Sequence, residues 1–350
     1  MKIAVLMSGG VDSTVAAALL KEQGHELLGL TMRQLEDDSA LYAARTAAEQ
    51  LGIPHHTADL RAEFEQTVIA GFCSGYAHST TPNPCVECNR SIKFGLLLEK
   101  ARILGAHKVA TGHYARVQWD DDSMRWLLKK GLDAQKDQSY FLWRLSQQQL
   151  ARAVFPLGAL TKRQVRQIAG ARGITAAESK ESQEICFIRD DYREFLSSRL
   201  DMPPGDFTDT GGNILGRHQG LHLYTVGQRK GLGVAAAGKP RYVLRLEPES
   251  NRVVLGDDEE LYQPGVCAAQ WNFIADEAAM AVGQRVQIKI RYTPRQVTAT
   301  IARRREDGFV FVFDTPQRAV TPGQSAVCYR DDVTLGGGII TSPAWPGSDF

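Results

Sequence analysis

The sequence predicts an α/β protein in which an N-terminal doubly wound parallel sheet is followed by a small central domain and a C-terminal antiparallel β-barrel. Apolar strand-like runs first alternate with helix-like segments, which is typical of a parallel sheet covered on both faces. From about Leu196 the chain is rich in glycine, and from about Gly265 it consists of short β-rich runs separated by turn residues. We therefore expect domains over residues 1–195, 196–264 and 265–345.

The first part repeats one unit, a buried strand followed by a helix, and glycines mark where the helices end. The stretch "TPNPCVECN" (81–89) is expected to be a loop, because two closely spaced prolines interrupt both regular hydrogen-bond ladders. In sequence order, the expected elements are strand 2–7, helix 12–24, strand 25–32, helix 41–52, strand 53–60, helix 61–76, helix 90–105 and a strand with its loop over 107–116. Ligands of such sheets bind beyond the carboxyl ends of the strands.

The last part of the chain predicts a small antiparallel barrel. Its β-rich runs are "RVQIKIRY", "QVTATIARR", "FVFVFD" and "QSAVCYR", which start at residues 285, 296, 309 and 324. The tail "TSPAWPGSDF" (341–350) is expected to be a frayed end.

Composition narrows the class of protein. Lys and Arg number 41 against 40 Asp and Glu, so there is no global basic signature, although a local basic face for RNA remains open. No run approaches the ~18 apolar residues of a membrane span, and the N-terminus does not resemble a signal peptide. We expect a cytoplasmic protein without a membrane partner. In such a chain, the six cysteines suit buried, catalytic or metal-binding roles better than a disulfide framework.

The stretch "LMSGGVDS" predicts an anion site. It lies between the first strand and the first helix, where backbone N–H groups and the positive end of the helix dipole are available to a phosphate. It contains neither Gly-Lys-Ser/Thr nor G-x-G-x-x-G, which excludes two common nucleotide loops. An ordinary capped helix is the alternative interpretation. The residues concerned are Leu6, Met7, Ser8, Gly9, Gly10, Val11, Asp12 and Ser13.

The cysteines are the second candidate for chemistry. Cys85 and Cys88 form a C-x-x-C pair followed by Arg90 and Lys93, and nearby cations and a helix N-terminus favour the thiolate. The spacing also suits a pair of metal ligands. Cys186 lies between two apolar residues, and from its surroundings alone a small buried hydrophobic residue is an equally good interpretation.

"SGGVDS" directly after the first strand resembles the pyrophosphate loop of the PP-loop ATP pyrophosphatases (adenine nucleotide alpha hydrolase-like fold). Eight motifs in order, namely "SGGVDS", "TPNP", "ATGHYAR", "KDQSYFL", "FPLG", "SQEICFI", "YTVGQRKGLG" and "TPGQSAV", resemble the tRNA-specific 2-thiouridylases, the MnmA family, over nearly the whole chain. The resemblance implies a PP-loop adenylation domain, a small central domain and a tRNA-binding β-barrel. It also implies that O2 of the wobble uridine, U34, is adenylated with ATP and then replaced by sulfur. The products would be 2-thiouridine, AMP and pyrophosphate.

The resemblance further implies roles for individual residues. Cys186 would carry the persulfide sulfur, Cys88 would be the nucleophile that attacks it or pairs with it, and Asp12 would assist Mg²⁺. Met32 and Gly112 would lie around the adenosine, next to the pyrophosphate loop formed by residues 6–13. The positions implied to contact RNA are Asn83, Pro84 and Cys85 at the target base, and His113, Lys136, Asp137, Gln138, Arg291, Tyr292 and Gln324 elsewhere on the tRNA. The implied partners are the anticodon stem-loop of tRNA and a sulfur-relay protein or cysteine desulfurase.

One departure from the family pattern opens a second mechanism, because Cys85 stands where many members have Asp. Cys85, Cys88 and Cys186 could then hold three irons of a [4Fe–4S] cluster and leave the fourth open to sulfide. The other functional hypotheses are another adenylating PP-loop enzyme, an RNA-binding protein with a degenerate loop, and a sulfur carrier. The sequence leaves the sulfur donor, the set of tRNAs and the oligomeric state open.

Overall fold

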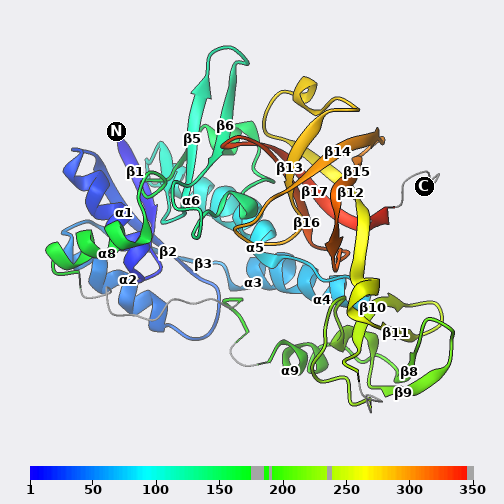
Figure 1. Cartoon of the computed structure of the whole chain (residues 1–350). Coiled ribbons are helices and arrows are strands. Elements are labelled where there is room, and N and C mark those ends of the chain that lie inside the picture. The colour runs from blue at the N-terminus through cyan, green and yellow to red at the C-terminus, as the bar shows by residue number, and fades with distance from the viewer. Residues whose placement is uncertain (175–184, 189–190, 235–238, 345–350) are drawn as a thin grey trace.

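The computed structural model in Figure 1 describes residues 1–174, 185–188, 191–234 and 239–344. Its helices are α1 Val11–Glu22, α2 Ser39–Gln50, α3 Arg61–Phe64, α4 Ala70–Ala77, α5 Pro84–Glu87, α6 Leu97–Ile103, α7 Gln147–Leu150, α8 Lys162–Ala171 and α9 Tyr192–Ser197. Its strands are β1 Lys2–Leu6, β2 Glu26–Arg33, β3 His55–Asp59, β4 Lys108–Ala110, β5 Ala115–Asp120, β6 Arg125–Lys130, β7 Ala153–Val154, β8 Gly205–Thr208, β9 Ile214–His218, β10 Tyr242–Glu247, β11 Arg252–Gly256, β12 Tyr262–Phe273, β13 Arg285–Lys289, β14 Val297–Arg304, β15 Phe309–Arg318, β16 Ser325–Arg330 and β17 Val333–Ala344.

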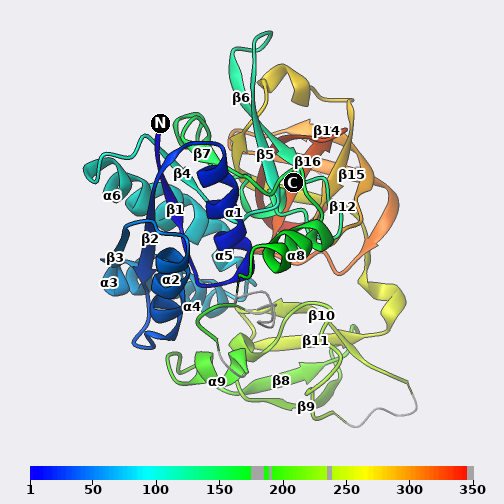
Figure 2. The same cartoon turned by 90° about the vertical axis from the view of Figure 1, so that its left-hand side faces the viewer.

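The N-terminal sheet is parallel and doubly wound, as predicted. Its strand order is β3-β2-β1-β4-β7, and every neighbouring pair is parallel. Side chains of a strand alternate between faces: Ile3 and Val5 pack with residues of α1 and α2, whereas Ala4 packs with residues of α4 and α6. Helices therefore cover both faces of the sheet (Figure 2), and the carboxyl ends of β1, β2 and β4 meet at one edge.

The predicted loop over 81–89 is wrong in its second half, because a helix begins at Pro84 rather than at Arg90. Proline is well tolerated at the first helical position, where its missing N–H has no intrahelical partner to lose. The Asn83 side chain caps this helix by accepting a hydrogen bond from the backbone N–H of Cys85 (3.1 Å). The helix continues through a π-helical segment, Cys88–Leu96, into α6. Cys85 and Cys88 consequently lie on its first turns.

The segment 107–116, expected to be a strand with its loop, also contains the start of a further strand. Only Lys108–Ala110 belongs to the parallel sheet, and after a short loop the hairpin β5–β6 begins at Ala115. This hairpin extends the sheet of the barrel, because Lys129 in β6 pairs with Val333 in β17. The N-terminal half of the chain thus supplies two strands to the C-terminal sheet.

The C-terminal part forms a closed antiparallel barrel, as predicted. Its order is β12-β15-β14-β13-β16-β17, and pairing of β12 with β17 closes it. The expected frayed end is wrong for residues 341–344, since β17 continues to Ala344, which pairs with Gly265. Closure explains this, because an open barrel would leave unpaired strand edges. Residues 345–350 lie outside the described part of the chain.

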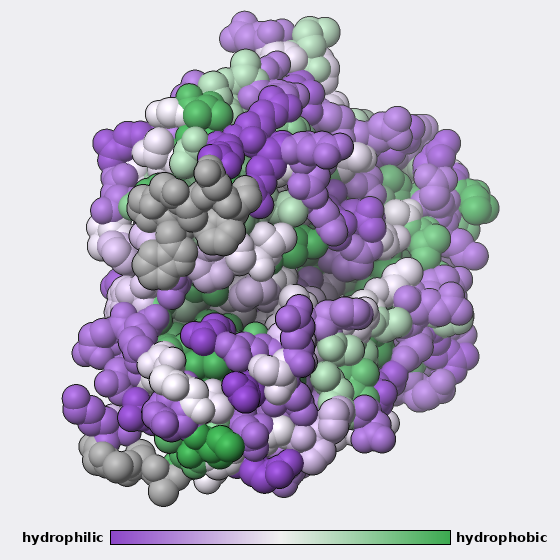
Figure 3. Space-filling model, turned by 90° about the vertical axis from the view of Figure 1, so that its right-hand side faces the viewer, coloured by the Kyte–Doolittle hydropathy of each residue, from purple (hydrophilic) through white to green (hydrophobic). Residues whose placement is uncertain are grey.

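The central domain consists of short strands and turns, again as predicted. Its sheet has the order β10-β11-β8-β9 and buries Phe207, Val243 and Val253 in a small core of its own. Figure 3 shows this domain below the barrel, with a hollow between the two on a mostly hydrophilic face. Among the described helices, none is long and apolar enough to cross a membrane.

A buried ion pair fastens the N-terminal part to the barrel. The Lys289 ammonium on β13 lies 3.0 Å from the Asp137 carboxylate, and the two side chains are only 3% and 2% exposed. Asp137 also accepts hydrogen bonds from the backbone N–H groups of Gly131 and Ser139 and from the Ser139 hydroxyl. Asp137, expected to contact tRNA, therefore has its carboxylate committed inside the protein.

We expect the change Lys289→Met to destabilise the protein by about 3–5 kcal/mol, because it leaves the buried Asp137 carboxylate without a counter-charge. Arg285→Ala, which breaks an exposed pair with Asp314 on the same barrel, should cost at most about 1 kcal/mol. The free energy of unfolding from urea titrations checks both values. A loss below about 1 kcal/mol for Lys289→Met would show that the pair contributes nothing to holding the two parts together.

Candidate active site

The glycine loop lies between the end of β1 and the start of α1. Gly10 is the N-cap residue of α1 and has no side chain to cap it, so the first backbone N–H groups of the helix receive no side-chain bond from this position. The Ser13 hydroxyl accepts a hydrogen bond from the backbone N–H of Ser8 (3.2 Å) and donates one to the Gly10 carbonyl (3.1 Å). These bonds hold the loop folded over the helix start, a geometry suited to a phosphate group.

The Asp12 carboxylate faces a cation that the sequence did not point to. Lys162, the first residue of α8, donates to both carboxylate oxygens at 2.7 and 2.8 Å, and the Tyr114 hydroxyl donates to one of them at 2.8 Å. A capping box at Thr161 marks the start of α8 in the sequence. Nothing in that motif indicates that the lysine beside it reaches Asp12, because the contact joins segments that are far apart along the chain.

Two neighbouring strands bring further residues to the same edge. The Thr31 hydroxyl at the end of β2 donates to the carbonyl of Met7 (2.8 Å), which places the adjacent, half-buried Met32 beside the glycine loop. After β4, Gly112 packs directly against the first turn of α1. The segments around Ser8, Met32 and Gly112, predicted to surround one nucleotide, therefore come from adjacent strands of the sheet.

His113 is half-buried against two aromatic rings. Its ring forms a triangle of contacts with the rings of Phe94 and Phe155, whose centroids are 6.4 and 6.0 Å away. Its Nδ1 is 2.6 Å from the Thr111 hydroxyl oxygen. Burial, reinforced by the positive charge of Lys93, holds the pKa of His113 well below its ordinary value. The imidazole is therefore neutral at pH 7 and is available as a hydrogen-bonding group rather than as a cation.

The three cysteines singled out in the sequence come together. Cys85 and Cys88 lie on the start of the α5 helix, and Cys186 lies in the described segment 185–188, where the Gln34 amide donates to its sulfur (3.5 Å). Charge on Cys85 or Cys186 would raise the pKa of Cys88, and charge on Cys85 would raise that of Cys186, as expected for neighbouring thiols. All six cysteines, which lie within the described residues, are free thiols.

Burial sets the protonation of these thiols. Crowding by surrounding protein atoms raises the pKa of all three, that of Cys88 to about 12, even though Cys85 and Cys186 keep exposed surface. The Lys93 ammonium lowers each pKa but does not offset the desolvation. The expectation that flanking cations make Cys85 and Cys88 better thiolates is therefore corrected. The Lys93 cation is present, but burial outweighs it, and the Cys88 thiol is protonated at neutral pH.

We expect Cys88 to react with iodoacetamide about fiftyfold more slowly than an ordinary exposed thiol at pH 8. Its thiolate fraction is about a thousandfold smaller, and the higher intrinsic nucleophilicity of the more basic thiolate recovers only about twentyfold. The rate should keep rising with pH beyond 9, since the raised pKa moves deprotonation upward. Peptide mass spectrometry across pH 7–10 measures this, with urea-unfolded protein as control. A folded-state rate that levels off near pH 9 would contradict it.

The barrel contacts the segment that precedes the cysteines. The Gln324 amide donates to the carbonyl of Thr81 (2.7 Å), and the Thr81 N–H donates to the carbonyl of Pro322 (2.8 Å). Gln324, predicted to contact tRNA, thus also holds in place the segment that precedes Asn83. This role could not be predicted from the sequence, because it depends on where a loop between two barrel strands lies.

The remaining predicted RNA contacts differ in accessibility. Tyr292 is 43% exposed and packs on the ring of Phe141 (4.4 Å between centroids), whereas the Arg291 guanidinium donates to the carbonyl of Arg318. The Gln138 side chain is half-buried, and its carbonyl oxygen accepts a hydrogen bond from the backbone N–H of Tyr114 (3.0 Å). Lys136 remains half-exposed beside it.

The described residues contain no group of three or more His, Cys, Asp or Glu side chains arranged to hold a metal ion. Cys85, Cys88 and Cys186 as they stand are therefore neighbours without being a ligand set. The group that the structure does assemble is a cluster of three thiols with Lys93 and Gln34 beside them. Gln34 follows β2, at the edge of the sheet that also carries the glycine loop after β1.

Three family models match successive parts of the chain. They are described as a tRNA methyl transferase HUP domain over residues 1–190, a tRNA methyl transferase PRC-barrel domain over 193–257, and an aminomethyltransferase beta-barrel domain over 264–340.

Curated relatives match over almost the full length. A tRNA-specific 2-thiouridylase MnmA of Syntrophomonas wolfei is 51% identical over 340 residues, which is 97% of this chain and 100% of that one. MnmA 1 of Caldanaerobacter subterraneus and MnmA of Acetivibrio thermocellus, which have the same description, are each 48% identical over 97% of this chain. The matches cover 97% and 99% of those proteins.

Proposed function

The chain belongs to the tRNA-specific 2-thiouridylase family, and on that premise we propose how its own residues thiolate the RNA. The protein is a tRNA 2-thiouridylase, an ATP-using sulfurtransferase that acts on tRNA. The position modified, the order of steps and the residue roles below are our proposal. Family membership favours this activity over another adenylating enzyme, a bare RNA-binding protein or a sulfur carrier.

The first step is adenylation. O2 of U34 attacks the α-phosphorus of ATP, the bond between the α- and β-phosphates breaks, and pyrophosphate leaves. This converts a poor leaving oxygen into AMP. The N–H groups at the start of α1 and the Ser8 and Ser13 hydroxyls would hold the pyrophosphate, with Met32 and Gly112 beside the adenosine. His113, neutral and in contact with Thr111, offers a hydrogen bond in the loop next to the nucleotide.

The second step is sulfur transfer. The terminal sulfur of a Cys186 persulfide attacks C2 of the base, the C2–O2 bond breaks, and AMP leaves with its oxygen. The Cys88 thiolate then attacks Sγ of Cys186, and the S–S bond breaks so that the outer sulfur stays on C2 with its electron pair. The products are 2-thiouridine and a Cys88–Cys186 disulfide, which an external dithiol reduces. A sulfur-relay protein or cysteine desulfurase recharges Cys186.

The observation that carries this proposal is the convergence of Cys88 and Cys186. The two residues come from distant parts of the sequence, and their thiols are close enough for charge on one to raise the pKa of the other. Lys93 lies beside both and favours their thiolates. Because the raised pKa makes Cys88 a weak nucleophile in this state, we propose that tRNA binding reorganises the pocket before transfer.

Two metal groups, Mg²⁺ and a [4Fe–4S] cluster, bear on this mechanism. Asp12 would be a suitable oxygen ligand for Mg²⁺, which would supply positive charge to offset that of the leaving pyrophosphate. The present pairing of Asp12 with Lys162 means that the lysine must move away from the carboxylate or bind the phosphates itself. The [4Fe–4S] alternative draws on the proximity of Cys85, Cys88 and Cys186, but their arrangement in the described structure is not that of a ligand set. Anaerobic reconstitution followed by a visible absorption spectrum distinguishes the cluster mechanism from the persulfide relay.

The RNA contacts complete the proposal. The anticodon stem-loop would lie across Lys136, Arg291, Tyr292 and the Asn83–Cys85 segment, with U34 extruded from the stack toward the cysteines. Arg and Lys would contact phosphates, and the exposed ring of Tyr292 suits stacking on a base. Gln138 and Asp137 would act indirectly, through the internal bonds described above.

The test is a direct assay. The protein is incubated anaerobically with ATP, Mg²⁺, a dithiol and unmodified tRNA carrying U34, together with a cysteine desulfurase and free cysteine as the source of persulfide sulfur. The digested RNA is analysed by mass spectrometry. We expect ATP-dependent 2-thiouridine at position 34, one AMP for each thiouridine, and no product with the same tRNA carrying C34. AMP release without thiouridine would move the chemistry to another substrate.

A further inference from the structure

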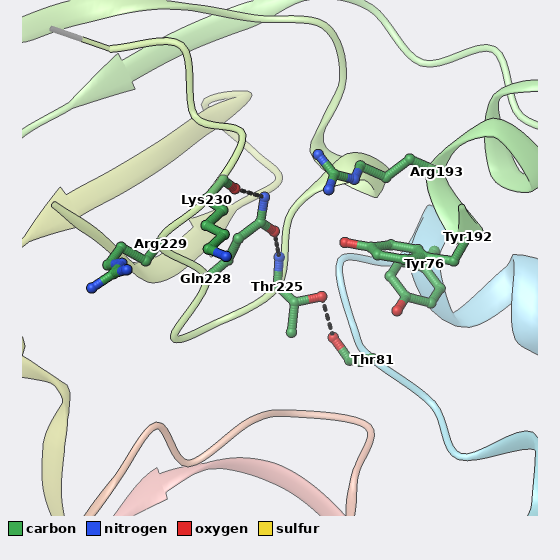
Figure 4. A pocket seen from close by; sticks show the side chains of 8 residues that line it. All are labelled: Tyr76, Thr81, Tyr192, Arg193, Thr225, Gln228, Arg229 and Lys230. Atoms are coloured by element: carbon green, nitrogen blue, oxygen red, sulfur yellow. Dashed lines mark hydrogen bonds between the residues drawn. The ribbon is translucent and has the colours of Figure 1, made fainter. Parts of the chain in front are cut away.

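A cavity lies where the central domain meets the N-terminal part, away from the glycine loop. It has a volume of about 540 Å³ and takes its walls from α4, the segment before Asn83, α9 and the loop after β9. Figure 4 shows the side chains that line it: Tyr76, Thr81, Tyr192, Arg193, Thr225, Gln228, Arg229 and Lys230. The loop residues belong to the motif "YTVGQRKGLG", to which the proposed chemistry assigns no role.

The lining of this cavity is cationic. It includes Arg193, Arg229 and Lys230, and no Asp or Glu is among the described residues that line it. Within the described residues, neither Arg229 nor Lys230 forms an ion pair, and Arg193 is paired only with its neighbour Asp191 (3.3 Å). In Figure 4 the Arg193 head group lies above Thr81, the Lys230 side chain lies beside Gln228 on the other loop, and Arg229 is directed away from the remaining side chains. Such a lining attracts an anion.

The cavity wall is held in place rather than formed by loose surface side chains. The Gln228 side chain accepts from the Thr225 N–H (3.1 Å) and donates to the Lys230 carbonyl (3.1 Å), which fixes the turn that carries the lysine. The Arg193 guanidinium lies against Gly231, where a Cβ would come within 2.5 Å of Nη1. The glycine therefore allows the arginine from α9 to approach the loop.

The walls also include both chain segments that carry the reactive cysteines. Thr81, whose hydroxyl donates to that of Thr225 (3.2 Å), shortly precedes Cys85, and Tyr192 shortly follows Cys186. The rings of Tyr76 and Tyr192 face each other with centroids 5.7 Å apart. A ligand in the cavity would thus touch the ends of two segments whose far ends must meet for sulfur transfer.

We propose that this cavity binds a backbone phosphate of the tRNA, with its ribose, and that occupancy fixes the two cysteine segments relative to each other. The proposal rests on the proposed function, since it takes the RNA to be the substrate. Arginine and lysine would pair with the phosphate oxygens, and the Thr, Tyr and Gln groups would bond ribose hydroxyls. Free inorganic phosphate has the same chemistry and is the alternative source.

The test compares Arg193→Gln and Lys230→Gln with Arg217→Gln, which removes one exposed charge from β9 of the same domain. Fluorescence anisotropy measures tRNA binding to the full-length protein over a range of salt concentrations. We expect each cavity variant to bind tRNA about tenfold more weakly than wild type. The slope of log K against log salt should fall by about one, and ATP affinity should not change. Arg217→Gln should match wild type.

Other results would contradict this proposal or the proposed function. Cavity variants that bind tRNA with the affinity and salt slope of Arg217→Gln overturn the proposal. If calorimetry shows that they have lost inorganic phosphate binding while tRNA binding is intact, the site takes a free anion and the proposal is wrong. Wild-type protein is assayed for thiolation in parallel, which tests the proposed function separately from this site. If wild type thiolates tRNA normally and the variants bind tRNA normally, only the phosphate site in the cavity is disproved. If the variants bind tRNA more weakly but wild type does not thiolate it, the phosphate site is supported and the proposed function is disproved.

Discussion

Replacing Cys186 by serine should lower formation of 2-thiouridine by about a thousandfold or more while leaving ATP-dependent adenylation of the RNA in place. A serine hydroxyl cannot hold the transferable sulfur, and the loss of a group that forms a covalent intermediate has effects of this size. The glycine loop, Asp12 and Lys162 are untouched by the change. AMP release should therefore persist at the rate at which the adenylated base hydrolyses.

Two further cysteine variants make the experiment decisive. Cys73→Ala removes a buried thiol in α4 that belongs to the apolar core, so it controls for a general effect of losing a cysteine and should keep full activity. Cys85→Ala separates the mechanisms, because a persulfide relay between Cys88 and Cys186 does not use this thiol, whereas a three-cysteine cluster does. Retained thiolation by Cys186→Ser would exclude the relay. The cluster would be favoured if Cys85→Ala lost activity and also lost a visible absorption band that wild type shows.

The features that could be predicted from the sequence depend on short-range patterns. The alternation of strand and helix predicted the parallel sheet, because each βα unit carries its own periodicity and its own terminating glycine. The glycine loop was recognisable for the same reason, since Ser8 to Ser13 are contiguous. The residue resemblance added the role of Cys186, which its apolar neighbours would have hidden.

The features that could not be predicted depend on contacts between distant segments. Lys162 reaches Asp12 and Lys289 reaches Asp137 across long stretches of chain, and no local periodicity records either pair. The helix that begins at Pro84 could not be told from the predicted loop, because a proline fits equally the start of a helix and the middle of a loop. The protonated state of Cys88 was missed for a related reason: the cation that favours its thiolate is near in sequence, whereas the atoms that bury it are not.

Replacing Gly112 by alanine should weaken ATP binding by about a hundredfold. A Cβ at this position would lie 2.8 Å from the carbonyl carbon of Asp12 and 2.9 Å from the backbone nitrogen of Ser13, closer than real Cβ atoms approach backbone. The backbone of Gly112 is not in the left-handed region, so the cost is steric rather than conformational. The rigid start of α1 must then shift, and displacement of a binding group by about 1 Å can cost about a hundredfold.

The matched control is Gly170→Ala in α8, where a Cβ would meet nothing within 4 Å. That change should leave ATP affinity as in wild type and should raise thermal stability slightly, because alanine is the better helix former. Calorimetric titration with ATP and the rate of AMP release measure the effect, and circular dichroism with tRNA anisotropy shows whether Gly112→Ala remains folded. A folded Gly112→Ala protein that binds ATP within threefold of wild type would mean that the phosphates do not sit on the first turn of α1. In that case the contact between the β4 loop and α1 would serve packing alone, and the nucleotide would have to be placed elsewhere along the sheet edge.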